Sequence, residues 1–258
     1  MWKTVFDSVT GASHDTSGTP CQDACRVVTI TSSSGEELLI IACADGAGSA
    51  KCAADGSMIA CDEVVKYVQT LPHVSTWLTS VTRDDAVAWI GHVRSAIAGR
   101  AAELNEPVRQ LATTLLVAVI GESASVFIHI GDGAIVVRED DDFRCMFWPQ
   151  SGEYANTTNF VTDDDFADKI AYEVRDARID ECVVFTDGLE RLILRFDNHT
   201  VHRPFIEPML QNMRSAESTD HFFTPLREFL ASARINERTD DDKTLILATR
   251  LSDNGTIR

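Results

Sequence analysis

Residues 37–50 read ELLIIACADGAGSA, an apolar run that ends at Asp45 and passes directly into a turn with almost no side chains. The run is short and bounded by charged residues and glycine, which is typical of a buried β-strand. Asp45 would leave this rigid strand with the carbonyl of Gly46 accessible beside it. An Asp-Gly pair is also a common turn former, so this stretch alone does not separate a functional site from an ordinary turn.

Further aspartates stand in matching settings along the chain. Asp187 follows the apolar run 182–185, and the aspartates at 240–242 precede the apolar run 244–248. Asp23 follows Gln22, and Asp132 lies in the turn sequence IGDG. Carboxylates that converge repel one another unless a cation lies between them, and hard ions such as Mg²⁺ and Mn²⁺ prefer oxygen ligands. We therefore expect one folded site around a divalent metal.

The fold class follows from the order of the predicted elements. Helical periodicity covers 58–68 and 86–104, the second preceded by a capping box of Thr82 and Asp85, and a later helix follows Thr224 and Pro225. Strands are predicted at 27–30, 38–44, 125–130, 134–137, 182–185 and 244–248. Strands, two helices, more strands, helices and a last strand indicate antiparallel sheets flanked by helices.

Two short connections carry predictions of their own. Only residues 131–133 separate the strands 125–130 and 134–137, which predicts an antiparallel hairpin between them. The polar stretch 138–142 predicts a second hairpin tip, exposed to solvent. No linker divides the sequence, so we expect a single domain over 1–258.

Composition restricts the classes of partner. A formal net charge of −17 repels polyanions, and the lysines and arginines form no run, so neither nucleic acid nor an anionic membrane is expected to bind. The longest apolar runs are far too short to span a membrane, and no signal peptide is recognised, which predicts a cytoplasmic protein. The seven cysteines fit reduced thiols better than disulfides or a zinc site.

Taken together, the motifs SHDTSGTPCQDA, ADGAGSA, ATTLLVAV, IGDGAIVV, FTDGLERL and DDKTLILA resemble the metal-dependent serine/threonine protein phosphatases of type 2C, in that family's order and over nearly the whole chain. The resemblance is closest to the compact bacterial members. It implies an α+β fold with four layers, α-β-β-α, in which helices flank both faces of a central antiparallel β-sandwich. It also implies hydrolysis of phosphoserine and phosphothreonine in proteins by a water or hydroxide that bridges two Mn²⁺ or Mg²⁺ ions.

The resemblance assigns a role to each motif. Asp45 would bridge both ions, Gly46 would give its carbonyl to one, and Asp187 and Asp241 would complete the other. Asp23 would orient the water. The remaining implied roles are a possible third metal ion at Asp132 and a turn at Thr113 and Thr114 that shapes the site from behind.

Several positions depart from the family pattern. Gln22 replaces a Glu ligand of many relatives, and Gly18 stands where an Arg that binds phosphate is expected. Arg191 stands where many bacterial relatives have another acidic ligand for the third metal ion, with Glu190 beside it as a partial substitute. His14 and Lys51 are the candidates to bind substrate phosphate instead. For both, an ordinary structural role remains the alternative, a hydrogen-bonded turn histidine and a solvated lysine.

Residues 148–166 are polar and rich in Asn and Thr, and the resemblance implies a variable flap there that shapes substrate choice. The simpler alternative is a surface loop whose aspartates at 163–165 cap the next helix. The departures above also leave open a catalytically silent phosphatase-like module that binds a partner. The resemblance further implies a phosphoprotein substrate and a serine/threonine kinase as a counterpart.

Overall fold

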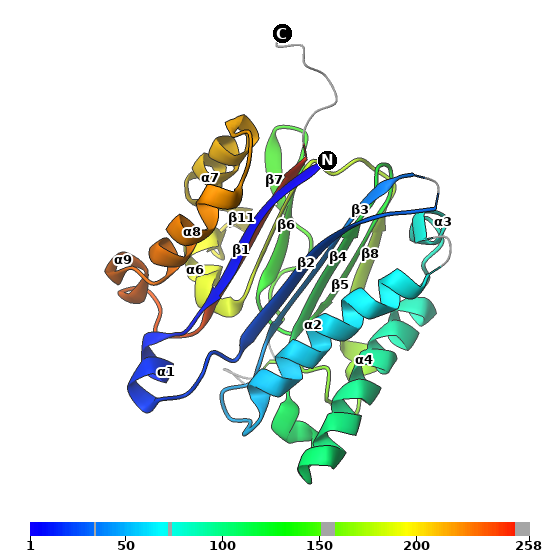
Figure 1. The fold of residues 1–258 in the computed structure, drawn as a ribbon, viewed down its shortest axis with the longest axis vertical. Helices are drawn as coiled ribbons and strands as arrows, with labels where there is room; N and C mark the ends of the chain where they lie inside the picture. The colour runs from blue at the N-terminus through cyan, green and yellow to red at the C-terminus, as the bar shows by residue number, and fades with distance from the viewer. Residues whose placement is uncertain (34, 72–73, 151–157, 251–258) are drawn as a thin grey trace.

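The computed structural model describes residues 1–33, 35–71, 74–150 and 158–250, and within them the chain forms two five-stranded sheets that face each other (Figure 1). One sheet has the order β1-β12-β9-β6-β7 and the other β2-β3-β4-β5-β8, and all of their strand pairs are antiparallel. The strands of the first sheet are β1 Trp2–Val9, β12 Lys243–Arg250, β9 Glu181–Phe185, β6 Ala134–Glu139 and β7 Asp142–Cys145. Those of the second are β2 Asp23–Thr31, β3 Glu37–Asp45, β4 Leu115–Ile120, β5 Ser125–Ile130 and β8 Ala171–Arg175.

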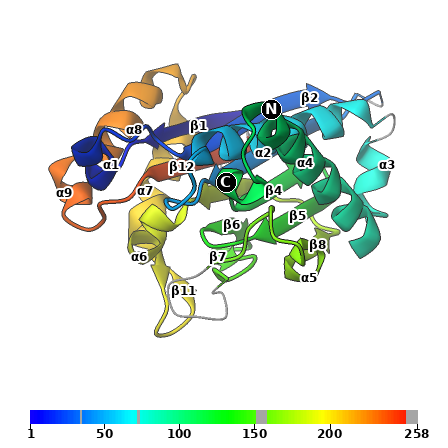
Figure 2. The same ribbon diagram turned by 90° about the horizontal axis from the view of Figure 1, so that it is seen from below.

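Helices cover the outer face of each sheet. The second sheet is covered by α2 Ala53–Thr70 and α4 Arg83–Leu104, with α3 Val74–Leu78 and α5 Phe166–Lys169 nearby (Figures 1 and 2). The first sheet is covered by α6 Glu190–Ile193, α7 Arg203–Ser215, α8 Phe223–Leu230 and α9 Ala233–Asn236. The remaining elements are α1 Ala12–Ser17, the short ladder of β10 Leu194–Arg195 and β11 Thr200–Val201, and the 3₁₀ turns Val108–Leu111, Asp187–Leu189 and Asp220–Phe222.

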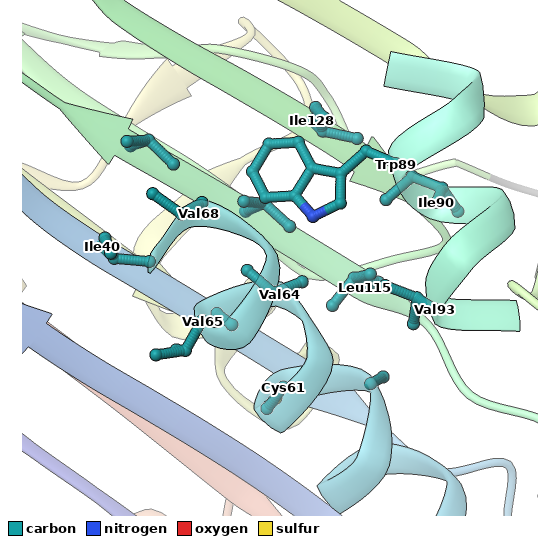
Figure 3. Packing of buried hydrophobic residues seen from close by; sticks show 14 of the residues in the cluster. Ile40, Cys61, Val64, Val65, Val68, Trp89, Ile90, Val93, Leu115 and Ile128 are labelled. Atoms are coloured by element: carbon teal, nitrogen blue, oxygen red, sulfur yellow. The ribbon is translucent and has the colours of Figure 1, made fainter. Parts of the chain in front are cut away.

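The central strands β4, β5, β9 and β12 are buried along their whole length, on both faces, which explains the four layers. In β3, Ile40 packs toward α2 and α4, whereas the next residue, Ile41, packs between the two sheets. Figure 3 shows the first of these cores, where the ring of Trp89 from α4 lies among Val68 of α2 and Ile128 of β5. A continuous apolar run packs into two cores, because successive side chains of a strand point to opposite faces of the sheet. The predicted α+β sandwich is confirmed.

One prediction about the connections is wrong. β5 and β6 do not pair as a hairpin, because β5 belongs to the second sheet and β6 to the first. Gly131 and Gly133, with φ of 105° and 80°, let the chain cross between the sheets in three residues, a backbone that side chains with a Cβ rarely adopt. The second predicted hairpin is confirmed, since β6 pairs with β7 around the polar tip.

The predicted helices are confirmed with small shifts. The capping box of Thr82 and Asp85 opens α4, and α8 begins at Phe223, one residue before the predicted cap. The elements that were not predicted from the sequence include β1, α1, α3, β4, α7, β8, β10 and β11. Among the described residues, no helix combines the length and the apolar character needed to cross a bilayer.

Candidate metal centre

Asp45 lies at the end of β3, directly opposite Asp23 at the start of β2. Two threonines hold its backbone from behind. The Asp45 carbonyl accepts hydrogen bonds from the Thr114 amide at 2.8 Å and the Thr113 hydroxyl at 2.9 Å, and the Asp45 amide donates to the Thr114 hydroxyl at 2.9 Å. Hydrogen bonds of the Asp45 backbone, in the strand and the turn, therefore fix the point from which its carboxylate extends.

Gly46 continues this edge of the sheet. Its amide donates to the Gln22 carbonyl at 3.1 Å, and a Cβ at this position would lie 2.7 Å from the Ala53 carbonyl oxygen at the start of α2. Only glycine permits this close approach of helix and strand. The glycine of the sequence ADGAGSA that follows Asp45 is thus required by the packing of α2 against the end of β3.

Three of the predicted acidic residues converge. Carboxylate oxygens of Asp45, Asp132 and Asp187 all lie within 4.8 Å of one another, although the residues belong to β3, the crossing between the sheets and the turn after β9. Asp241 falls outside this group of three, but it is near enough that its charge contributes to raising the pKa values of Asp45, Asp132 and Asp187.

Burial and mutual repulsion both raise the pKa values of these carboxyl groups. Burial, followed by the charges of Asp23 and Asp187, raises the pKa of Asp45 well above its ordinary value. Burial and the charges of Asp132 and Asp241 raise the pKa of Asp187 to about 8. A divalent ion at the centre of these carboxylates would favour their ionised forms and lower their pKa values.

Glu190 joins the cluster from α6. Its Oε1 accepts a hydrogen bond from the Gly133 amide at 2.8 Å, and burial together with the charge of Asp132 raises its pKa to about 7. Arg191, the next residue, is exposed and lines a groove on the far side of α6. Glu190, and not Arg191, therefore faces Asp132.

Asp23 is buried next to the cluster. Its Oδ2 accepts hydrogen bonds from the hydroxyls of Thr186 at 2.8 Å and Thr244 at 2.7 Å, while its Oδ1 has no partner among the described residues. Burial raises the pKa of Asp23 to about 7, against the opposing effect of the two hydroxyls. The result is a fixed carboxyl group with one oxygen available.

Asp242 is a site residue that sequence reasoning missed. Its Oδ1 accepts from the Gly11 amide at 2.7 Å, its Oδ2 accepts from the Gln22 amide at 2.6 Å, and His14 Nδ1 lies 2.9 Å from the same Oδ2. Asp242 thereby ties α1 and the segment before β2 to the last strand. In a run of three aspartates, nothing in the sequence marks which one turns inward.

His14 and Lys51, the two predicted phosphate-binding residues, lie in different settings. His14 is largely buried against Asp242, with 17% of its side chain exposed. Lys51 is 70% exposed and forms an ion pair with Glu106. The structure thus brings His14 to the acidic centre and leaves Lys51 at the surface.

The predicted flap, 148–166, meets the site at its described ends, while 151–157 lie outside the described residues. The Gln150 amide donates a hydrogen bond to the Gly131 carbonyl at 2.9 Å, and the side-chain Oε1 of Gln150 accepts one from the Gly131 amide at 3.0 Å. Asn159 donates to the same Oε1 at 2.9 Å. Both ends of this segment are therefore attached to the turn that carries Asp132.

The donor set fits a hard divalent cation. The buried oxygens Gln22 Oε1, Asp23 Oδ1 and Asp132 Oδ1 have no hydrogen-bond partner among the described residues. Buried polar atoms normally have partners, so these oxygens, one of them on Asp132 of the carboxylate cluster, fit a hard metal ion as their partner. The thiol of Cys21, which lies near enough to Asp23 for the charge of Asp23 to act on it, has a pKa raised above its ordinary value, mainly by burial, which does not favour a soft metal.

Comparisons with known proteins agree with this geometry. The family model for protein phosphatase 2C matches residues 10–231, a range that contains Asp45, Asp132 and Asp187. The chain is 34% identical over 250 residues to serine/threonine-protein phosphatase 3 of Escherichia coli strain K12, which covers 96% of this chain and 98% of the relative.

Solved structures share the fold. The catalytic domain of the serine/threonine protein phosphatase PstP, in complex with two manganese ions, superposes with a TM-score of 0.63 at 16% identity, over 97% of this chain and 99% of that one. The serine/threonine phosphatase Stp1 from Staphylococcus aureus superposes with a TM-score of 0.60 at 16% identity, over 98% of this chain and 96% of that one. The predicted class of enzyme, a protein serine/threonine phosphatase, is confirmed together with the fold. This chain therefore belongs to the protein phosphatase 2C family.

Proposed function

We propose that this chain hydrolyses phosphoserine and phosphothreonine in proteins with two Mn²⁺ or Mg²⁺ ions held by the carboxylate cluster. The observation that supports this most directly is the convergence of Asp45, Asp132 and Asp187 within 4.8 Å. Asp45, Asp187, Asp241 and the Gly46 carbonyl would hold the two ions. Gln22 would add its amide oxygen, a neutral ligand where a carboxylate would bind more strongly.

When bound, the ions supply the electrophilic chemistry, since they acidify water and offset the charge that develops on the phosphate oxygens. The protein supplies the geometry. Asp23, with Oδ2 occupied by two hydroxyls, offers Oδ1 to orient the attacking water and to accept its proton near neutral pH. No side chain of the site acts as a nucleophile in this proposal, so no phosphoenzyme is expected.

We assign three further roles to residues around this centre. Asp132 and Glu190 form a candidate site for a third ion, since both are acidic groups at the Gly131–Gly133 turn. His14, oriented by Asp242, is the candidate to contact the substrate phosphate, whereas the ion pair of Lys51 with Glu106 favours a surface role for that lysine. The segment 148–166 is proposed to act as a flap over the substrate. A kinase counterpart remains a prediction from the family resemblance, and a cytoplasmic location remains a prediction from the sequence.

Manganese-dependent hydrolysis of p-nitrophenyl phosphate and of a phosphothreonine peptide tests the proposal. Asp45→Ala and Asp187→Ala are expected to lower kcat/KM at least about a hundredfold, because each removes a metal ligand. Asp176→Ala, an exposed aspartate after β8, is the matched control and should leave turnover unchanged. Absence of turnover in the wild-type protein with bound Mn²⁺ would instead support the silent binding module, which the neutral Gln22 favours.

A further inference from the structure

A large groove lies outside the metal centre, between the outer face of the first sheet and the helices α6 to α9. Its volume is about 1140 Å³, above the range of roughly 300–1000 Å³ that small-molecule pockets usually occupy. Figures 1 and 2 show these four helices gathered on one side of the molecule, away from α2 and α4. They are short, so they do not cover the sheet continuously.

The floor of the groove is apolar and aromatic. Phe205 and Met209 of α7, Phe222 before α8 and Phe229 of α8 line it, and all four side chains are only partly buried. Aromatic and methionine side chains that are half exposed in a concave surface are typical of the anchoring positions of a protein-binding site.

The rim of the groove is basic, in contrast to the rest of the molecule. The exposed residues Arg191, Arg195, Arg234 and Arg238 line it, and none of them pairs with a carboxylate among the described residues. Arg195 Nη2 contacts only the ring nitrogen of His202, at 2.8 Å.

Arginines elsewhere on the surface are mostly paired. Arg26 pairs with Asp62, Arg100 with Asp55 and Arg227 with Asp7. Asp197 and Glu237 also line the groove, so the basic side chains outnumber the acidic ones there. A cluster of unpaired arginines in a chain with a net charge of −17 forms a local positive field.

The groove adjoins the metal centre along the chain. Arg191 follows Glu190, whose carboxylate bonds the Gly133 amide beside Asp132, and Arg238 stands three residues before Asp241. Neighbouring residues of the chain thus line the two sites, Glu190 with Arg191 on α6 and Asp241 with Arg238 before β12.

We propose that this groove binds an acidic segment of the phosphoprotein substrate, next to the phosphorylated residue and with at least one aromatic or aliphatic anchor. The inference rests on the proposed function, because it assigns the sequence preference of that same site. Guanidinium groups bind carboxylates through paired hydrogen bonds, and the apolar floor accepts the anchor. A second copy of this chain would bring its own excess of negative charge, which disfavours it as the occupant unless it presents such a segment.

Direct binding tests the inference without depending on catalysis. The probes are two fluorescent unphosphorylated peptides, one with a phenylalanine among several glutamates and one with every glutamate replaced by glutamine. We expect the acidic peptide to bind the wild-type protein about tenfold more tightly than the glutamine peptide, with an affinity that falls as salt rises. The double variant Arg195→Glu with Arg234→Glu should lose this preference.

A second double variant controls for net charge. Lys66→Glu with Arg100→Glu changes the charge equally, on α2 and α4 over the other sheet, and should keep the preference. Mn²⁺-dependent turnover of p-nitrophenyl phosphate should stay within about twofold in both variants, whereas kcat/KM for an acidic phosphothreonine peptide should fall about tenfold only in the groove variant.

Three outcomes decide against the inference. Equal binding of the two peptides by the wild-type protein refutes it, and so does equal loss in both double variants. A dimer of the wild-type protein that the groove variant dissociates would assign the groove to self-association instead. If the acidic peptide binds as expected but no phosphate is released from any substrate, the proposed function fails and the groove assignment remains.

Discussion

Replacing Asp187 with Asn should stabilise the protein in the absence of divalent metal. Asp187 is held among like charges, and burial followed by the charges of Asp132 and Asp241 raises its pKa from 3.8 to about 8. The folded state therefore holds a proton that the unfolded chain releases between these pH values. Below pH 4 Asp187 does not lower the free energy of unfolding. As pH rises from there toward 8, Asp187 lowers the free energy of unfolding by about 1.4 kcal/mol for each pH unit.

The size of the effect follows from this window. At pH 7 the accumulated cost is about 4 kcal/mol, and an uncharged amide avoids it. If half of this gain is lost to contacts that Asn does not reproduce, about 2 kcal/mol remains, or roughly 4–8 °C in Tm for a chain of this size. The assay is thermal unfolding in chelator at several pH values, followed by the same series with excess Mn²⁺.

Metal should reverse the order of the two proteins. Mn²⁺ at a hundred times its Kd adds about 2.7 kcal/mol to the wild-type protein, and Asp187→Asn should lose most of this gain because it lacks a ligand. Asp176→Asn, at an exposed position, should match the wild-type protein throughout. A lower melting temperature of Asp187→Asn than of the wild-type protein, in chelator at pH 7, would refute a destabilising charge at Asp187. Equal stabilisation of both proteins by Mn²⁺ would refute its role as a metal ligand.

Other substitutions address the supporting contacts. Asp242→Ala leaves two buried backbone amides without acceptors and should cost about 2–5 kcal/mol in urea unfolding, whereas Asp240→Ala, at an exposed neighbour, should cost little. Thr244→Val removes a hydroxyl that lowers the pKa of Asp23, so the acid limb of the kcat/KM profile should move up by about one pH unit; an unmoved limb would exclude Asp23 as the titrating group. Gly131→Ala places a Cβ 2.5 Å from the Thr114 side chain at a positive φ and should cost about 1–3 kcal/mol in thermal unfolding, with weaker Mn²⁺ binding in titration calorimetry.

The sequence was sufficient to predict the acidic centre because the relevant signals are local. Asp45, Asp132 and Asp187 each stand at the end of a short apolar run, and the ends of buried strands meet where the sheets meet. The capping box of α4 is equally local, since Thr82 and Asp85 identify each other within one turn. These features need no knowledge of the partner strands.

The features that were not predicted depend on which strands pair and on where the chain continues after a turn, and local patterns do not encode either. Whether β5 and β6 pair or separate depends on the glycine dihedrals at 131 and 133, and the sequence IGDG suits either outcome. α7 carries Pro204 and Pro208, which weaken the helical pattern that its buried face would otherwise show. Strand β1 reads as a mixed polar segment because only its Trp2, Lys3 and Val5 are fully buried.

The same limit applies to the groove. Arg191, Arg195, Arg234 and Arg238 are dispersed in the sequence, and no run of basic residues announced them. They become a cluster only because α6, β10 and α9 fold over the same sheet. A search for basic runs in the sequence does not detect a basic patch made by tertiary structure, so the lack of such a run did not exclude this surface.

The position of β12 between β1 and β9 has a consequence for biosynthesis. Trp2 is paired with Arg250, and β1 has no other partner in its sheet. A nascent chain on the ribosome can build the β2-β3-β4-β5-β8 sheet with α2 and α4 early, but β1 must wait until residue 250 has emerged from the exit tunnel. Asp241 arrives with the same strand, so hydrolytic competence and completion of the sandwich should appear together, after translation of this region, rather than in stages.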